Sequence, residues 1–226
     1  MVLHRILPLF GAFKSKLKPV FIQHGLTATS FSFVISSDKF STDPRNGIGH
    51  NLGLELAKFG YDVWLGNNRG SPYSMQNIYF SNDDPRFWNF TFDDISQQDV
   101  PVVIKFVLKK TGKSKLSYIG HSQGTMVMFA LLSNTSNHHM NTIIEPFIAI
   151  SPVAILKNST SLFRYVVETV KLFSDNNLDK PIFKRPNPYS SFKDFFCNID
   201  SKIFCKYFYM QICGFSDQLN EVSYLL

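Results

Sequence analysis

One short segment of the sequence combines a reactive hydroxyl with the glycines that a sharp turn around it would need. It reads Gly120-His121-Ser122-Gln123-Gly124, the pattern Gly-x-Ser-x-Gly. A serine in such a turn, between a strand and a helix, projects its hydroxyl over the edge of a sheet, where it can attack a carbonyl carbon. Glycines are expected on both sides because a Cβ at either position would collide across the tight turn. The pattern therefore predicts a nucleophilic serine and acyl-transfer chemistry.

The residues around Ser122 fit that turn. Residues 116–119 are an apolar run of strand length, and residues 124–132 are too apolar all round for a surface helix. A helix that begins just after the serine would direct its unpaired N–H groups at an oxyanion formed there. The alternative is an ordinary Gly-Ser turn before a buried helix, which would carry no chemistry.

Strands and helices alternate along the rest of this region. Further strands are expected at residues 20–22, 61–65 and 147–151, and helices at 48–59 and from about 93 to 110. Pro101 should kink or divide the second helix, and Pro146 is expected at the beginning of its strand. The alternation predicts an α/β fold, a mostly parallel doubly wound sheet covered on both faces. The loops that follow the strands then share one edge, where ligands bind in such sheets.

Composition excludes several classes of protein. The hydrophobic content of 44% is that of a globular chain, and the net charge of +6 comes from scattered lysines, which argues against a nucleic-acid partner. The sequence contains no stretch of 18 apolar residues, so no transmembrane helix is expected. The apolar N-terminus lacks the cleavage site of a convincing signal peptide. The three cysteines have no zinc-site spacing, so neither a metal nor another cofactor is expected.

The character of the chain changes near residue 153. Of the 53 residues from Phe163 to Phe215, 13 are aromatic, and three prolines divide the segment into short pieces. We expect residues 1–152 to form the N-terminal part of the α/β core and residues 153–226 to form part of a helical cap over the sheet edge. The aromatic side chains either fill the core of that cap or face lipid.

Several further segments, together with the Ser122 turn, occur in an order and spacing that are specific to one family. They are residues 18–26, which end in His24-Gly25-Leu26, residues 60–70, which end in Asn67-Asn68-Arg69-Gly70, residues 87–88, Asp93, Asp99, Pro101 and residues 109–112, 120–125 and 151–154. In this order and spacing the sequence resembles the acid lipase family of α/β-hydrolases, truncated at both ends. The resemblance implies hydrolysis of neutral lipid esters, either triacylglycerols or cholesteryl esters, at a lipid interface without a metal or cofactor.

The resemblance also assigns roles to individual residues. Ser122 would be the nucleophile, with Gly120 and Gly124 as the glycines of its turn, and the backbone N–H groups of Leu26 and Gln123 would form the oxyanion hole, as is general for this fold. In the cap, Cys197 and Cys205 would pair and Cys213 would stay free. A secreted or lysosomal location is implied, where the sequons at Asn89, Asn134 and Asn158 could be glycosylated.

The catalytic acid and histidine of a triad are missing from these 226 residues. The fold requires the order Ser, acid, His, but the last histidine is His139, and no Asp or Glu lies between Ser122 and it. His24 could be a base, although a role in fixing its loop is the stronger interpretation. Arg69 is likewise either a structural ion-pair partner or a substrate clamp.

Three functional hypotheses follow. The first is an ester hydrolase of which this chain is a fragment. The second is a catalytically inactive lipid-binding or regulatory remnant. The third, an esterase of another α/β-hydrolase group, is disfavoured by the cap cysteines and by the turn at residues 67–70.

Overall fold

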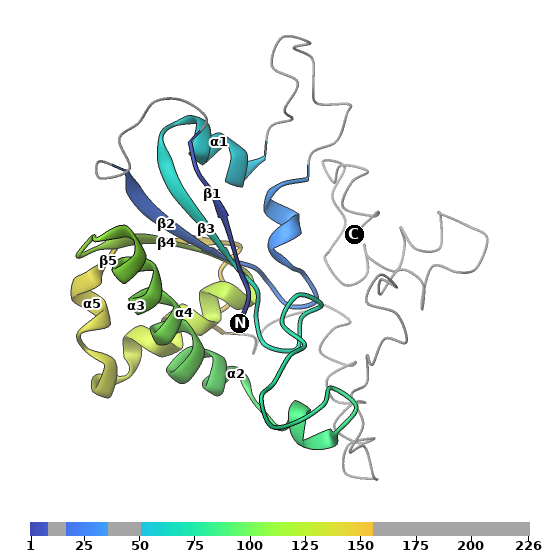
Figure 1. Cartoon of the computed structure of the whole chain (residues 1–226). Coiled ribbons are helices and arrows are strands. Elements are labelled where there is room, and N and C mark those ends of the chain that lie inside the picture. The colour runs from blue at the N-terminus through green and yellow to red at the C-terminus, as the bar shows by residue number, and fades with distance from the viewer. Residues whose placement is uncertain (9–16, 36–50, 156–226) are drawn as a thin grey trace. The chain divides into compact units, whose positions relative to one another are not determined.

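The computed structural model of the chain describes residues 1–8, 17–35 and 51–155, and these fall into two compact units (Figure 1). Met1–Gln76 and Asn89–Ala154 belong to the first unit, and Asn77–Trp88 belongs to the second. The expected cap at residues 153–226 lies almost entirely outside the described residues, as do its three cysteines. The division at residue 152 therefore stays a prediction.

Within its described residues, the first unit is built on a five-stranded sheet with the order β1-β3-β2-β4-β5. The strands are β1 (Leu3–Ile6), β2 (Lys18–Gln23), β3 (Tyr61–Gly66), β4 (Leu116–His121) and β5 (Ile144–Ile150). All pairings are parallel except that of β1 with β3. The expected mostly parallel α/β sheet is confirmed, and β2, β3, β4 and β5 lie where strands were expected, with bounds that differ by a few residues.

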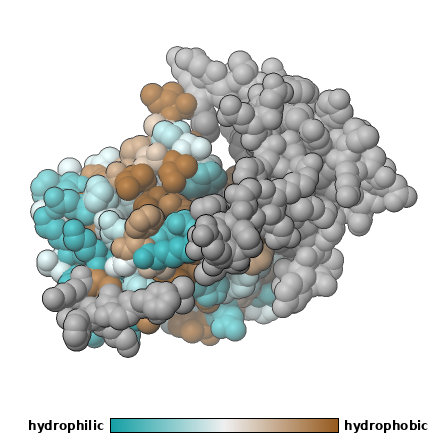
Figure 2. Space-filling model, turned by 90° about the horizontal axis from the view of Figure 1, so that it is seen from above, coloured by the Kyte–Doolittle hydropathy of each residue, from teal (hydrophilic) through white to brown (hydrophobic). Residues whose placement is uncertain are grey.

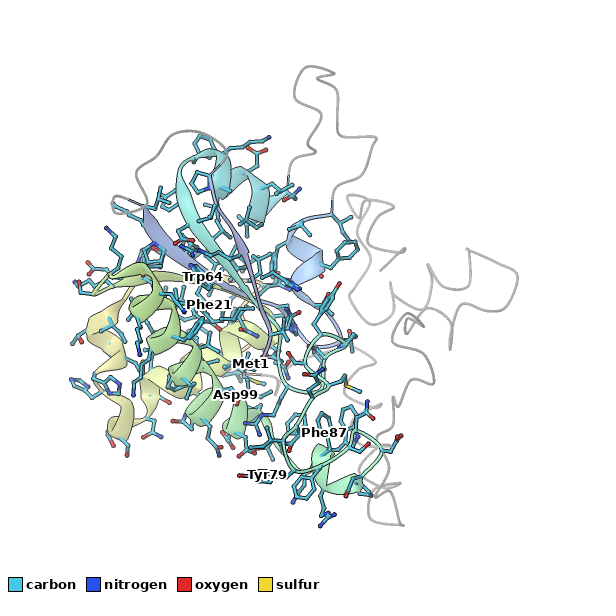
Figure 3. The ribbon with its side chains drawn as sticks, viewed as in Figure 1. Met1, Phe21, Trp64, Tyr79, Phe87 and Asp99 are labelled. Atoms are coloured by element: carbon cyan, nitrogen blue, oxygen red, sulfur yellow. The ribbon has the colours of Figure 1, made fainter. Side chains whose placement is uncertain are left out.

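Apolar side chains alternate between the two faces of the central strands. On one face Phe21, Trp64 and Tyr118 pack against α3 and α4. Phe21 and Trp64 are labelled in Figure 3. On the other face Ile22 and Leu65 pack with residues of α1 and η2. Figure 1 shows the corresponding layers, with α1 on one side of the sheet and α3, α4 and α5 on the other. Burial on both faces explains why these strands read as continuous apolar runs.

The helices begin and end at recognisable capping residues. Asn51 caps α1 (Leu52–Lys58) by accepting a 2.9 Å hydrogen bond from the Leu54 N–H. Gly112, with a φ of 68°, ends α3 (Val100–Thr111) in the left-handed conformation that favours glycine. The other helical elements are η2 (Ser30–Phe33), η4 (Pro85–Trp88), α2 (Phe92–Asp94), η5 (Ile95–Asp99), α4 (Gln123–Ser133), η6 (Thr135–Asn137) and α5 (Met140–Ile143).

A π-helical turn resolves the conflict between Pro101 and the helix around it. Proline has no N–H to donate to the carbonyl four residues earlier. The helix widens over η5, where the Val100 N–H donates to the carbonyl of Ile95, five residues back. The expected interruption is thus a local widening between α2 and α3.

Three sequence-based expectations were wrong in detail. The strand β1 was not expected, since it is four residues long and contains Arg5, whose guanidinium pairs with buried Asp62 at 2.7 and 2.8 Å. Pro146 lies inside β5, where the register with β4 shifts, so its missing N–H falls at an irregularity of the ladder. Phe59, expected as the last residue of the helix at residues 48–59, instead follows the last residue of α1 and is 77% exposed.

The described part of the second unit consists of Asn77–Trp88 and Ile155. In Asn77–Trp88 the Trp88 indole donates to the carbonyl of Asn82 at 2.8 Å, and Arg86 pairs with Asp84. Within the described ranges of both units, no helix is long and apolar enough to span a membrane.

Helix α3 provides a direct test of this core. Ile104 is fully buried, whereas Val102 on the same helix is 66% exposed. We expect Ile104→Ala to lower the free energy of unfolding by about 2–5 kcal/mol because it leaves a cavity. Val102→Ala should change it by no more than about 0.5 kcal/mol. Urea unfolding followed by circular dichroism measures both, and equal losses would contradict the assigned packing.

Candidate active site

Ser122 lies at a sharp turn between β4 and α4. Its φ of 51° and ψ of −114° are unusual for a residue with a Cβ, and Gln123 is the first residue of the helix. The serine is half-buried, and its N–H donates to the carbonyl of Ile150, at the end of β5, over 3.0 Å. The expected strand-turn-helix geometry around this serine is confirmed.

The two flanking glycines are required by close backbone contacts. A Cβ on Gly120 would lie 2.7 Å from the carbonyl of Gly124, and one on Gly124 would lie 2.5 Å from the carbonyl oxygen of Gln23. Contacts this short with backbone atoms cannot be relieved by rotating a side chain. The Gly-x-Ser-x-Gly pattern therefore lets α4 begin directly against β2 and β4.

The loop after β2 passes beside the serine. A Cβ on Gly25 would lie 3.0 Å from the Cβ of Ser122 and 3.1 Å from Nδ1 of His121, so the backbone of this loop runs in contact with the turn. Leu26 follows immediately and is 50% exposed. The parallel pairing of β2 with β4 explains this proximity, because both strands end at the same edge of the sheet.

His24 fixes this loop through both of its ring nitrogens. Nε2 accepts the Asn68 N–H at 3.0 Å, so Nδ1 carries the proton and donates it to the carbonyl of Gly25 at 2.7 Å. Burial lowers the pKa of this imidazole, although the bond to Gly25 opposes that shift. The ring is therefore neutral and fully engaged, which confirms the loop-fixing role and argues against its service as a base for Ser122.

Asn68 connects three of the loops at this edge. Besides its N–H bond to His24, its side-chain oxygen accepts from Nε2 of Gln23 at 2.6 Å, and its amide nitrogen lies 3.5 Å from Oε1 of Gln123. Gln23 and Asn68 are both buried. This polar group joins the ends of β2 and β3 to the first residue of α4.

Tyr118, in β4, holds the first turn of α4 through a hydrogen bond from its hydroxyl. Its ring is completely buried between those of Phe21 and Phe147, and its hydroxyl donates to the carbonyl of Gly124 at 3.0 Å. Burial raises the pKa of this phenol far above its ordinary value, so the hydroxyl keeps the proton that it donates. The first turn of α4 is thereby held to the strand that precedes it.

Arg69 has a structural partner. Its guanidinium makes a two-bond ion pair with Asp99, at 2.6 and 2.5 Å, and lies over the ring of Phe90. Hydrogen bonding to Asp99 raises the pKa of this arginine. The pair links the loop after β3 to the π-helical turn η5, as the structural interpretation of Arg69 predicted.

The other histidines do not complete a catalytic pair with Ser122. His138 and His139 are exposed, and His4 bonds the hydroxyl of Ser30 at 2.8 Å and contacts the ring of Tyr73. Within the described residues, the hydroxyl of Ser122 has no hydrogen bond to a histidine, and no cluster of three metal-binding side chains is found.

Comparison with known sequences assigns the family. The sequence pattern described as "alpha/beta hydrolase fold" matches residues 18–162, which include every strand of the sheet except β1. The chain belongs to the alpha/beta hydrolase family.

Lipases are among the relatives of this family member. Human gastric triacylglycerol lipase is 36% identical over 213 residues, covering 91% of this chain and 49% of its own length, and human lipase member K is 34% identical over 220 residues with the same two coverages. Bovine gastric triacylglycerol lipase is 42% identical over 144 residues, 64% of this chain and 33% of its own. Epoxide hydrolase A from Mycobacterium thermoresistibile, a solved structure, aligns with 74% of this chain and 40% of its own at 14% identity and a TM-score of 0.42.

These matches confirm the expected resemblance to acid lipases. The chain spans about half the length of the human relatives it matches. Within the hydrolase fold, the sequence indicated the Ser122 turn but gave no sign of the connections made by Asn68 and Tyr118. Asparagine and tyrosine residues are common near such turns, and only the folded structure shows which groups they bond.

The state of His24 makes stability depend on pH. Histidine in an unfolded chain has a pKa of about 6.5, and the pKa of His24 in the folded chain lies below that ordinary value. The unfolded chain therefore binds more protons in acid. The contribution of His24 to the free energy of unfolding is fully present above the pKa of the unfolded histidine. It is lost as the pH falls from there toward the pKa of His24 in the folded chain.

We expect the wild-type chain to lose more stability between pH 8 and pH 5 than His24→Gln, measured as free energies of unfolding in urea. Burial also lowers the pKa of His121, which acts in the same direction, so the difference between wild type and variant isolates His24. Parallel pH profiles for the two proteins would contradict the buried neutral ring.

Proposed function

We propose that this chain is the nucleophile-bearing part of a serine ester hydrolase that acts on neutral lipids. The observation that carries the proposal is the strained turn at Ser122 with the Gly25-Leu26 loop in contact with it. An exposed serine in an ordinary turn would need neither the positive φ nor the close approach of three backbone segments. Such strain persists where the surrounding structure maintains it, and it occurs preferentially at functional sites.

The proposed reaction has two steps. The hydroxyl oxygen of Ser122 attacks the ester carbonyl carbon while a base takes its proton, and the oxyanion accepts hydrogen bonds from the N–H groups of Leu26 and Gln123. The carbon–oxygen bond to the alcohol then breaks, and the alcohol leaves with the proton. Water attacks the acyl-serine with the help of the same base, which releases the fatty acid and restores the hydroxyl.

The base and its carboxylate partner are proposed to come from outside these 226 residues. No Ser-acid-His order exists within the chain, and both ring nitrogens of His24 are engaged. The relatives with lipase names are about twice as long as the segment they share with this chain. A serine without a base stays protonated near neutral pH, and loss of the histidine in another serine hydrolase lowers turnover by about 10⁶.

Apolar side chains near this edge of the sheet support a lipid substrate. Leu26 and Phe31, in the segment after β2, are 50% and 51% exposed, and Tyr73, after β3, is 44% exposed. Figure 2 shows that apolar side chains reach the surface of the described part between polar ones. Together with the relatives named as gastric triacylglycerol lipases, these side chains support a neutral lipid ester as substrate, either a triacylglycerol or a cholesteryl ester. The proposed secreted or lysosomal location rests on the same relatives, and the proposed glycosylation rests on the sequons at Asn89, Asn134 and Asn158.

The proposal predicts a difference between two lengths of the protein. The chain as given and a version extended by the downstream coding sequence would be expressed in a secretory, disulfide-forming host and assayed with a short-chain and a long-chain ester. We expect hydrolysis by the extended version, abolished in its Ser122→Ala variant, and at least about 10³-fold less by the chain as given.

The other outcomes are equally informative. Comparable hydrolysis by the chain as given, lost on Ser122→Ala, would mean that a base exists within it. Absence of hydrolysis from both versions, together with binding to lipid vesicles, would favour the inactive lipid-binding protein instead.

A further inference from the structure

The hydroxyl of Thr125 connects the serine turn to the chain that leaves β5. Thr125 lies in the first turn of α4 and is fully buried. Its Oγ1 is 2.6 Å from the carbonyl oxygen of Ser122 and 2.9 Å from the backbone nitrogen of Val153. These two partners are 31 residues apart in the sequence and belong to different loops at the same sheet edge.

The direction of both hydrogen bonds is fixed by their chemistry. A backbone carbonyl can only accept, so the hydroxyl proton of Thr125 is donated to Ser122. A backbone N–H can only donate, so a lone pair of the same oxygen accepts from Val153. One hydroxyl therefore satisfies two backbone groups at once. Valine, which has the same shape but no hydroxyl, could not do this, and neither could threonine in another rotamer.

The backbone of Ser122 is held from the same direction at its other end. Its N–H donates to the carbonyl of Ile150 at 3.0 Å, one residue before Ser151, which itself has a φ of 48°. Its carbonyl also receives the Thr125 N–H at 2.9 Å. The strained serine is thus fixed on both sides by the segment at residues 150–153, on the amide side directly and on the carbonyl side through the Thr125 hydroxyl.

We propose that Thr125 is a positioning residue that couples the segment at residues 150–153 to the nucleophile. The inference rests on the proposed function, because it assigns Thr125 to the placement of the Ser122 hydroxyl and the Gln123 N–H. Residue 153 is also where we expect the cap to begin. A displacement of residues 150–153 would therefore act on the carbonyl of Ser122 through the hydroxyl of Thr125.

Two substitutions separate this role from simple packing. Thr125→Val keeps the shape of the side chain but removes both hydrogen bonds, whereas Thr125→Ser keeps the hydroxyl and removes only a methyl group. Thr111→Val is the matched control, since Thr111 also donates from Oγ1 to helix carbonyls, those of Val107 and Leu108, at the far end of α3. All three would be made in the chain as given and in its extended version.

Hydrogen exchange tests the connection without catalysis. In the chain as given, we expect the Val153 amide to exchange at least about tenfold faster in Thr125→Val than in wild type, because it loses its acceptor. Thr125→Ser and Thr111→Val should retain the wild-type rate at Val153. Unchanged exchange in Thr125→Val would overturn the connection.

Ester hydrolysis by the extended version tests the positioning. We expect Thr125→Val to lower kcat by about 10- to 100-fold with KM nearly unchanged, because small displacements of reacting groups slow the chemical step. Thr125→Ser should recover most of that loss, and Thr111→Val should match wild type. A wild-type kcat in Thr125→Val would overturn this inference alone, whereas an inactive extended wild type would overturn the proposed function and this inference with it.

Discussion

The site depends on how closely three backbone segments meet at the carboxyl edge of the sheet. The ends of β2 and β4 and the beginning of α4 approach so tightly that a Cβ at Gly25, Gly120 or Gly124 would lie 2.5–3.0 Å from its nearest neighbour. Within this contact the backbone of Ser122 adopts a positive φ, a conformation that costs on the order of 1–3 kcal/mol for a residue with a side chain. The parallel sheet and its two apolar layers supply the rigidity that maintains it.

Polar side chains beneath that contact keep the loops in register. His24, Asn68 and Gln23 are buried and bonded to one another or to the backbone, so each loop is held by a neighbour that belongs to a different strand. The His24 ring must stay neutral in this arrangement, since protonation would place a donor against the Asn68 N–H. This network fixes the loop after β2, which carries the Leu26 N–H that we propose for the oxyanion hole. A donor that is already fixed needs little reorganisation during a reaction.

Features that depend on local sequence could be predicted, and those that depend on distant contacts could not. The strand before Ser122, the turn and the following helix are encoded by adjacent glycines and apolar runs, and all three are present. The strand β1 was missed because Leu3–Ile6 is short and becomes a strand only by pairing with β3. The same applies to Thr125, an ordinary buried threonine until the chain returns at Val153, and to Pro146, whose place inside β5 follows from a register shift.

The central claim is that Ser122 is a nucleophile served by the N–H groups of Leu26 and Gln123. It is tested most directly by a crystal structure of the extended protein after reaction with an alkyl phosphonate ester. The account predicts a covalent bond from the Ser122 hydroxyl oxygen to phosphorus, with the phosphonyl oxygen about 3 Å from both backbone nitrogens. An adduct on another residue, or a phosphonyl oxygen directed away from these two groups, would contradict it.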